Sequence, residues 1–237
     1  MIHFLEWDSH FFGYKTGLIN ILNADFDIKQ AIKFGKEEGY QLCYAYIPPE
    51  LKLINQQSIE LGGILVDEKI VFCYDIPSLL ENVSPLSPNI HYFQEATLNS
   101  NLVRLSIQSG KFSRFNIDQN FKNQEFERMY TVWMQNAVTG KNDDKVLVYK
   151  VGQQIAGVLA LNTRLKDTNI EILAVDFNYR RKSIGTQLVE RAFEESQLLK
   201  SNTIQVVTQK ANKIACNFYQ KMGFEMAKIT NIYHFWL

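Results

Sequence analysis

The chain has 237 residues with 25 basic and 25 acidic side chains, so its formal net charge at pH 7 is zero. That balance argues against a general affinity for nucleic acid or for an anionic membrane surface. The hydrophobic content of 46% is ordinary for a globular protein, and the length permits one large domain or two small ones.

The first residues and the cysteines predict the cellular compartment of the protein. The first residues carry Glu6 and Asp8 rather than a basic, apolar leader, and no apolar run approaches the roughly 18 residues of a membrane span. Cys43, Cys73 and Cys216 are widely scattered, which favours neither a disulfide framework nor a metal site. We therefore expect a cytoplasmic protein with no metal, membrane or nucleic-acid partner, and we leave open a homodimer.

Residues 1–80 predict a small α/β lobe. Strand character is expected over 2–21 with a turn at Phe12-Gly13, followed in order by a helix over 27–38, a strand over 42–47, a helix over 51–61 and two short strands over 64–66 and 70–76. Residues 77–88 hold three prolines with Ser and Asn, which is typical of a linker, and we set its core at residues 81–88.

Residues 89–237 predict a larger α/β domain. The patterns indicate helices near 98–108 and 125–138, an antiparallel strand pair over 145–150 and 155–161, a strand over 170–175, a helix to Leu199, a strand over 203–208, a helix over 213–221 and closing strands through Tyr233–Trp236.

The stretch that follows the strand Ile170–Val175 is a basic turn, Arg180-Arg181-Lys182-Ser183-Ile184-Gly185, that opens a helix. The first backbone N–H groups of a helix lack intrahelical partners, and the helix dipole favours anions there. Such a turn predicts a phosphate-binding cradle. The alternative is a solvated basic helix start with no ligand.

A second motif lies downstream, Asn212-x-x-Ala215-x-x-x-Tyr219-x-x-x-Gly223-Phe224. In this order, the turn and this motif resemble the GNAT superfamily of N-acetyltransferases, in which a turn of the form Q/R-x-x-G-x-G/A holds the pyrophosphate of acetyl-CoA. Ser183 stands where the first Gly is usual. The resemblance covers about residues 90–237 and implies an α/β (α+β) GNAT fold with a mixed central sheet.

Shorter segments narrow the resemblance. Trp7–Gly13, Ser113–Phe115, Trp133–Val138 and Thr208-Gln209 recur in the same order in the dTDP-fucosamine (dTDP-4-amino-4,6-dideoxygalactose) acetyltransferases. This similarity implies direct transfer of an acyl group from acetyl-CoA, or another short acyl-CoA, to the amine of a dTDP-linked amino sugar for surface polysaccharide. The alternatives are a superfamily enzyme that acylates a peptide or other small amine, and an inactive CoA-binding regulatory module.

The two halves of the chain end alike, in a strand, a helix, a glycine and strands. Placing Gly62 on Gly223 aligns them without a gap, which predicts that residues 1–80 are a degenerate half-GNAT-like βαβαββ lobe. Ser58 then falls where the second copy has Tyr219, so the first lobe is expected to be non-catalytic. Two α/β units that share a layout by chance are the alternative.

The resemblance also implies site residues. Tyr219 would protonate the departing CoA sulfur, and Glu171, placed by the two-residue strand period on the face of Leu173 and Val175, is a tentative base beside the alternatives of a water relay or a salt-bridged Glu. The donor-binding residues are Leu173, Ala174, Val175, Arg180, Arg181, Lys182, Ser183, Ile184, Gly185, Thr186 and Asn212. The tentative acceptor-binding residues are Arg114, Phe115, Phe11, Phe12, Trp133 and Gln209, for which an ion pair or core packing is the alternative.

Overall fold

A ten-stranded sheet in the order β1-β2-β3-β10-β4-β9-β8-β7-β6-β5 runs through the protein in the computed structural model, which describes residues 2–21, 23–77, 87–95, 97–141, 144–164 and 166–237. The strands are β1 (Ile2–Phe4), β2 (Thr16–Ile19), β3 (Leu42–Ile47), β4 (Ile64–Asp75), β5 (Ile90–Tyr92), β6 (Lys145–Val151), β7 (Gln154–Arg164), β8 (Asp167–Val175), β9 (Thr203–Gln209) and β10 (Glu225–Trp236). The helices are α1 (Glu6–Phe12), α2 (Ile28–Glu37), α3 (Lys52–Glu60), α4 (Ser100–Ser109), α5 (Arg114–Ile117), α6 (Glu125–Val138), α7 (Ile184–Leu198) and α8 (Lys213–Lys221), with a 3-10 turn η1 at Phe177–Tyr179.

The sheet is mixed. β2 pairs with β3 and β8 pairs with β9 in parallel, and the other neighbouring strands pair antiparallel. The expectation of an α/β fold with a mixed sheet is confirmed. The helices over 125–138 and 213–221 begin and end at the expected residues.

Helices cover both faces of the C-terminal part of the sheet. Leu159 and Leu161 of β7 pack with residues of α7 and α8, whereas Val158 and Ala160, which alternate with them, pack with residues of α4 and α6. Successive side chains of a strand point to opposite faces, so these two apolar clusters lie on either side of one sheet. The site described below lies where this layered part ends.

The N-terminal segment differs from its prediction. Residues 6–12 form the helix α1 where strand character was expected. Glu6 and Asp8 lie in its first turn, where their negative charges interact favourably with the helix dipole. Gly13 ends the helix with a left-handed φ of 79°. The Oγ of Ser9 also accepts a hydrogen bond from the Thr16 N–H at 2.9 Å, which fixes the helix against β2.

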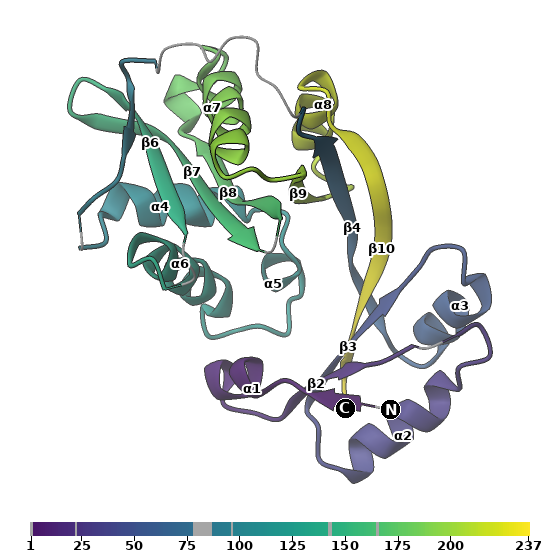
Figure 1. Cartoon of the computed structure of the whole chain (residues 1–237). Helices are drawn as coiled ribbons and strands as arrows, with labels where there is room; N and C mark the ends of the chain where they lie inside the picture. The colour runs from purple at the N-terminus through teal and green to yellow at the C-terminus, as the bar shows by residue number, and fades with distance from the viewer. Residues whose placement is uncertain (1, 22, 78–86, 96, 142–143, 165) are drawn as a thin grey trace.

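The two longest strands join the halves. The two short strands predicted over 64–76 are one strand, β4, and the closing strands are one strand, β10. β10 pairs with β3 of the N-terminal half on one side and with β4 on the other, while β4 pairs with β9 of the C-terminal half. Figure 1 shows β4 and β10 running side by side between the halves. Of the expected linker, residues 81–86 lie outside the described residues.

Candidate active site

The parallel strands β8 and β9 separate part-way along their length. Their ladder runs from Asp167 paired with Thr203 to Ile170 paired with Val206, and residues 171–175 and 207–209, although described, form no further pairs with each other. The backbone edges of Leu173 and Val207 therefore face a gap between two strands. An extended amide chain can bond such an edge as an added strand does.

The basic turn lies at the end of this gap. Arg181 and Ser183 have left-handed φ values of 61° and 58°, and α7 begins at Ile184 without a side-chain cap from Ser183. The Gln187 N–H donates to the Ser183 carbonyl at 3.0 Å, which is the first hydrogen bond of helix α7. Two left-handed residues in a non-glycine turn cost about 1–2 kcal/mol each and orient successive N–H groups into an anion-binding concavity.

Gly185 leaves open space inside the turn. A Cβ at this position would meet Phe218 at 3.5 Å and Val175 at 3.7 Å, which are ordinary van der Waals distances, and its φ is not left-handed. Neither packing nor backbone conformation in the protein alone therefore requires glycine here. A ligand that approaches the backbone closely would require it, which fits a pyrophosphate held by the amides of residues 184–186.

Side chains that the sequence reasoning missed hold the turn in place. Asp176 accepts a hydrogen bond from the Asn178 N–H at 2.8 Å and pairs with Arg104, and these contacts lower the pKa of this buried carboxyl group. The Val175 carbonyl accepts from the Gln108 amide at 2.8 Å and from Arg180 Nε at 3.2 Å. Arg180 therefore bonds the strand end, and its charge still lies at the surface.

Tyr219 is in the core cluster between the sheet and α8, with its ring 6.0 Å from Phe72 and 5.6 Å from Phe224. Burial raises the pKa of this phenol, so it is protonated at neutral pH. Asn212, the other residue of the motif, is the N-cap of α8, and its Oδ1 accepts the Ala215 N–H at 3.2 Å. Asn212 therefore has a structural role as a helix cap, in addition to the contact with acyl-CoA that we expect.

Glu171 lies at a β-bulge. β7 pairs Ala160 with Ile172 and then Leu161 with Ile170, so Glu171 has no register partner on that strand. Ile170, not Glu171, packs in the cluster that Leu173 and Val175 contact, whereas Ile172 packs on the opposite face. The bulge puts Ile170 and Leu173, which are three residues apart, against the same cluster, so the two-residue period breaks at Glu171. Its side chain is exposed and interacts electrostatically with Lys69 of β4.

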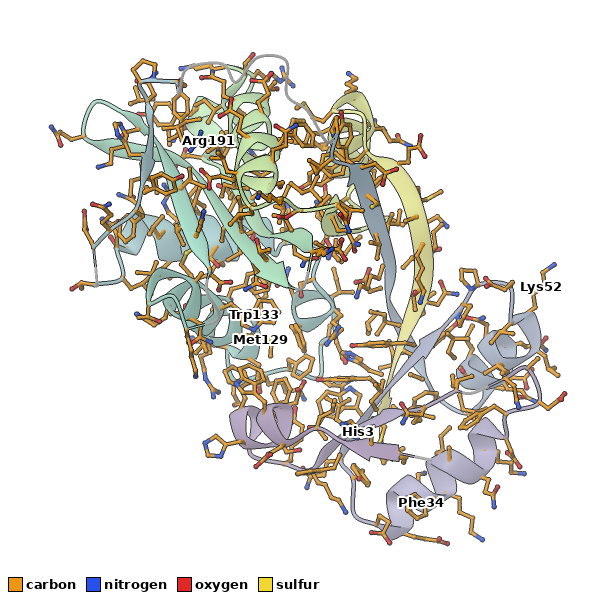
Figure 2. The ribbon with its side chains drawn as sticks, viewed as in Figure 1. His3, Phe34, Lys52, Met129, Trp133 and Arg191 are labelled. Carbon is orange, nitrogen blue, oxygen red and sulfur yellow. The ribbon has the colours of Figure 1, made fainter. Side chains whose placement is uncertain are left out.

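The predicted acceptor aromatics form the joint between the halves. Phe115 is only 4% exposed, and its ring centroid lies 6.0 Å from Phe12 and 6.2 Å from Trp133. Phe11 stacks on Trp7 at 5.1 Å. The buried Phe115 ring is enclosed by protein aromatics, so core packing is its evident role. Trp133, 37% exposed, lies on α6 toward the N-terminal half (Figure 2).

Arg114 has a position that core packing does not explain. Its guanidinium lies 4.4 Å from the Phe115 ring centroid, 4.8 Å from that of Tyr44 and 5.7 Å from that of Tyr46. The Nε atom is buried and has no hydrogen-bond partner. A planar cation held over aromatic rings with an unused donor can bind an oxyanion bidentately. Gln209 lies nearby at the end of β9, in register with Lys69 of β4.

Sequence reasoning missed the acidic groups around Arg114 and gave His234 a structural role. Asp67 lies on β4, and His234 lies on β10, where its Nδ1 is 2.7 Å from Asp118. Burial lowers the pKa of His234 to about 4 despite Asp118, so the ring is neutral and donates Nδ1–H to that carboxylate. Asp67 and Lys69 fell in the gap between two predicted strands, and reading 64–75 as one strand would have placed both on one face.

The described part of the chain contains no helix long and apolar enough to cross a membrane. It also contains no group of three or more His, Cys, Asp and Glu side chains that could hold a metal ion.

Comparisons with known proteins agree with this geometry. Residues 112–224 match the model of the acetyltransferase (GNAT) family. The spore coat polysaccharide biosynthesis protein SpsD of Bacillus subtilis (strain 168) is 24% identical over 124 residues, which are 52% of this chain and 43% of that protein. The match thus spans less than half the length of this curated relative.

Solved structures share the fold. A GCN5-related N-acetyltransferase from Sphaerobacter thermophilus superposes with a TM-score of 0.60 at 11% identity, over 93% of this chain and 72% of that chain. A functionally unknown conserved protein from Staphylococcus epidermidis ATCC 12228 has a TM-score of 0.60 at 13% identity, over 94% and 84%. A tandem GNAT protein from the clavulanic acid biosynthesis pathway has a TM-score of 0.54 at 10% identity, over 93% and 74%.

Proposed function

We propose that this chain, of which residues 112–224 match the model of the acetyltransferase (GNAT) family, transfers an acetyl or other short acyl group from acyl-CoA to the amine of a dTDP-linked amino-dideoxy sugar. The observation that carries the proposal is the gap between β8 and β9, with an anion-binding turn at one end and Arg114 with its unused donor on the acceptor side. The similarity to a polysaccharide biosynthesis protein supports a sugar acceptor.

The donor acyl-CoA would lie along β8. Its pyrophosphate would accept hydrogen bonds from the amides of residues 184–186, with Arg181 and Lys182 adding positive charge at the exposed rim. Its pantetheine amides would bond the free backbone edge of Leu173–Val175. A backbone N–H of the same edge can stabilise negative charge that develops on the carbonyl oxygen during transfer.

Tyr219 would act as the general acid. A thiolate leaving group needs a proton, and the raised pKa of Tyr219 keeps the phenol in its donating form. Protonation of the sulfur and attack by the amine can then occur in one ternary complex.

On the acceptor side, the Arg114 guanidinium would bind a diphosphate oxygen of the nucleotide sugar. The sugar amine would then reach the gap from the side on which Glu171 and Lys69 interact. Trp133 and Phe11 border this region from α6 and α1, whereas Phe115 and Phe12 support it from the core.

A thiol-release assay tests the proposal by crossing dTDP-linked 3-amino and 4-amino sugars with acetyl-CoA and longer acyl-CoAs. We expect turnover on at least one sugar and no turnover on peptides. Turnover on peptides alone would overturn the acceptor, and CoA binding without turnover on any amine would favour a regulatory module.

The variant Tyr219→Phe probes the acid directly. Loss of the hydroxyl should lower kcat by about 10²-fold while the CoA dissociation constant stays within twofold, because general acid catalysis typically contributes 10²–10⁴. Tyr233→Phe is a matched control, since that hydroxyl donates to Asn55 at 3.0 Å in the N-terminal half. Equal kcat values for Tyr219→Phe and the wild type would remove Tyr219 from the mechanism.

A further inference from the structure

Three buried polar atoms without hydrogen-bond partners belong to Arg114 and to two side chains that interact with it at the joint between the halves. They are Asp67 Oδ1, Arg114 Nε and His234 Nε2. Arg114 interacts electrostatically with both Asp67 and His234. A buried polar atom left unpaired costs about 1–3 kcal/mol, so several unpaired atoms around one cation indicate a place prepared for a polar ligand.

Asp67 lies on the acceptor side of the opening between β8 and β9. The last residue of β9, Gln209, is in register with Lys69, so Asp67 extends two residues beyond the end of that strand. Residues two apart on a strand share a face, and Lys69 on that face interacts with Glu171 at the bulge of β8. A row of charged side chains thus leads toward the gap in which the thioester would lie. It consists of Asp67, Lys69 and Glu171.

Burial and the neighbouring charges have opposing effects on the pKa of Asp67. Burial raises the pKa of Asp67 to about 7, Arg114 of α5 and Lys69 lower it, and Glu68 raises it. Asp8 of α1 and Tyr44 and Tyr46 of β3 face Arg114 from the N-terminal half, and Lys228 of β10 faces Lys69. His234 is the other candidate base nearby, but it is fully buried and bound to Asp118.

We propose that Asp67 is the general base that removes a proton from the acceptor ammonium, an inference that rests on the proposed function. A sugar amine reaches the site as an ammonium ion, which the Asp67 carboxylate binds and deprotonates. The amine lone pair then forms the C–N bond to the thioester carbonyl carbon, and the C–S bond breaks. The thiolate takes a proton from Tyr219, the tyrosinate recovers one from the acylated nitrogen, and Asp67 releases its proton to solvent.

The experiment measures kcat and kcat/KM against pH for the full chain at saturating acyl-CoA, with the dTDP-amino sugar that the wild type turns over. We expect the wild-type rate to fall below about pH 7, where Asp67 is protonated, and Asp67→Asn to lower kcat at least 100-fold. The acidic limb should disappear in that variant, and the CoA dissociation constant should stay within twofold. Asp67→Glu should restore part of kcat together with a limb.

Glu68→Gln is the matched control, because Glu68 is the next acidic residue on β4 but points to the opposite face, where it pairs with Lys210 at 2.6 Å. Its kcat at the pH plateau should match that of the wild type, and its acidic limb should remain but move to lower pH, because Glu68 raises the pKa of Asp67. An unchanged kcat and limb in Asp67→Asn, with both lost in Glu171→Gln, would give the proton transfer to Glu171 and overturn the proposal while the proposed function stands. A wild type inactive on every sugar would overturn both.

Discussion

The protein leaves enough space beside the Cα atom of Gly185 for a methyl group. The variant Gly185→Ala should keep the free energy of unfolding or raise it by up to about 1 kcal/mol, because alanine favours a helix and its Cβ makes ordinary contacts. The same methyl group would enter the space of the pyrophosphate, so the CoA dissociation constant should rise at least tenfold. Calorimetric titration with CoA and urea denaturation measure the two quantities.

Ser183→Gly is the control for this variant. It changes the same turn without adding an atom and allows the left-handed φ of 58° at no steric cost. CoA affinity should stay within about threefold of the wild type. Similar CoA affinities for Gly185→Ala and the wild type would mean that the pyrophosphate lies elsewhere.

The buried Asp67 carboxylate should lower the free energy of unfolding when it is ionised. Its folded pKa of about 7 exceeds the value of 3.8 for an ordinary Asp, so the folded state binds more protons between these pH values. Stability from this group is therefore greatest at low pH and is lost as pH rises toward and through 7. Asp67→Asn stays neutral and should be more stable than the wild type at pH 8, by about 1 kcal/mol once partial solvent screening is allowed for.

The measurement is the difference in unfolding free energy between this variant and the wild type, from urea denaturation at pH 5 and pH 8. The advantage of the variant should shrink at pH 5, where Asp67 is protonated and neutral in the folded state. A loss of stability of equal size at both pH values would show that Asp67 is a charge-independent structural residue.

At the scale of elements, β4 and β10 decide how the halves are held together. β4 belongs in sequence to the N-terminal half but lies between β9 and β10, which belong to the C-terminal half. The α3–Gly62–β4 and α8–Gly223–β10 connections repeat one pattern, with φ values of 85° and 89° at the two glycines. β10 thus extends the sheet of the N-terminal half and β4 that of the C-terminal half, so the halves exchange their last strands.

A fragment of residues 87–237 should therefore fail to fold alone. Without β4, the hydrogen-bonding edge of β9 and the apolar residues Val206 and Tyr219 beside Phe72 would face water. Its amide NMR spectrum should be poorly dispersed, and co-expression with residues 1–77 should restore a folded complex. A well-dispersed spectrum of the isolated fragment would contradict the strand exchange.

At the scale of the whole molecule, the joint has two components. One is the aromatic cluster of Phe115, Phe12 and Trp236 with its neighbours, and the other is the polar group around Arg114. Burial raises the pKa of Asp118, but hydrogen bonds from His234, the Asn120 amide and Trp236 outweigh it and hold that pKa near 2. This carboxylate ties the end of α5 to β10 through hydrogen bonds with His234 and Trp236.

Local patterns in the sequence were sufficient for several features. The helix periods of α6 and α8, the glycines after α3 and α8 and the basic turn before α7 are set by residues a few positions apart. The spacing of about two helical turns likewise placed Asn212, the N-cap of α8, and Tyr219 on one helix face. These features depend on helix geometry and capping, which neighbouring residues decide.

Only the tertiary structure decided the rest. Whether residues 64–75 form one strand or two, and which half β4 and β10 join, depends on partners more than a hundred residues away. The bulge at Glu171 comes from the register with β7. The polar group of Asp67, Arg114 and His234 draws on β4, α5 and β10, and it is assembled and buried only once the two halves have come together.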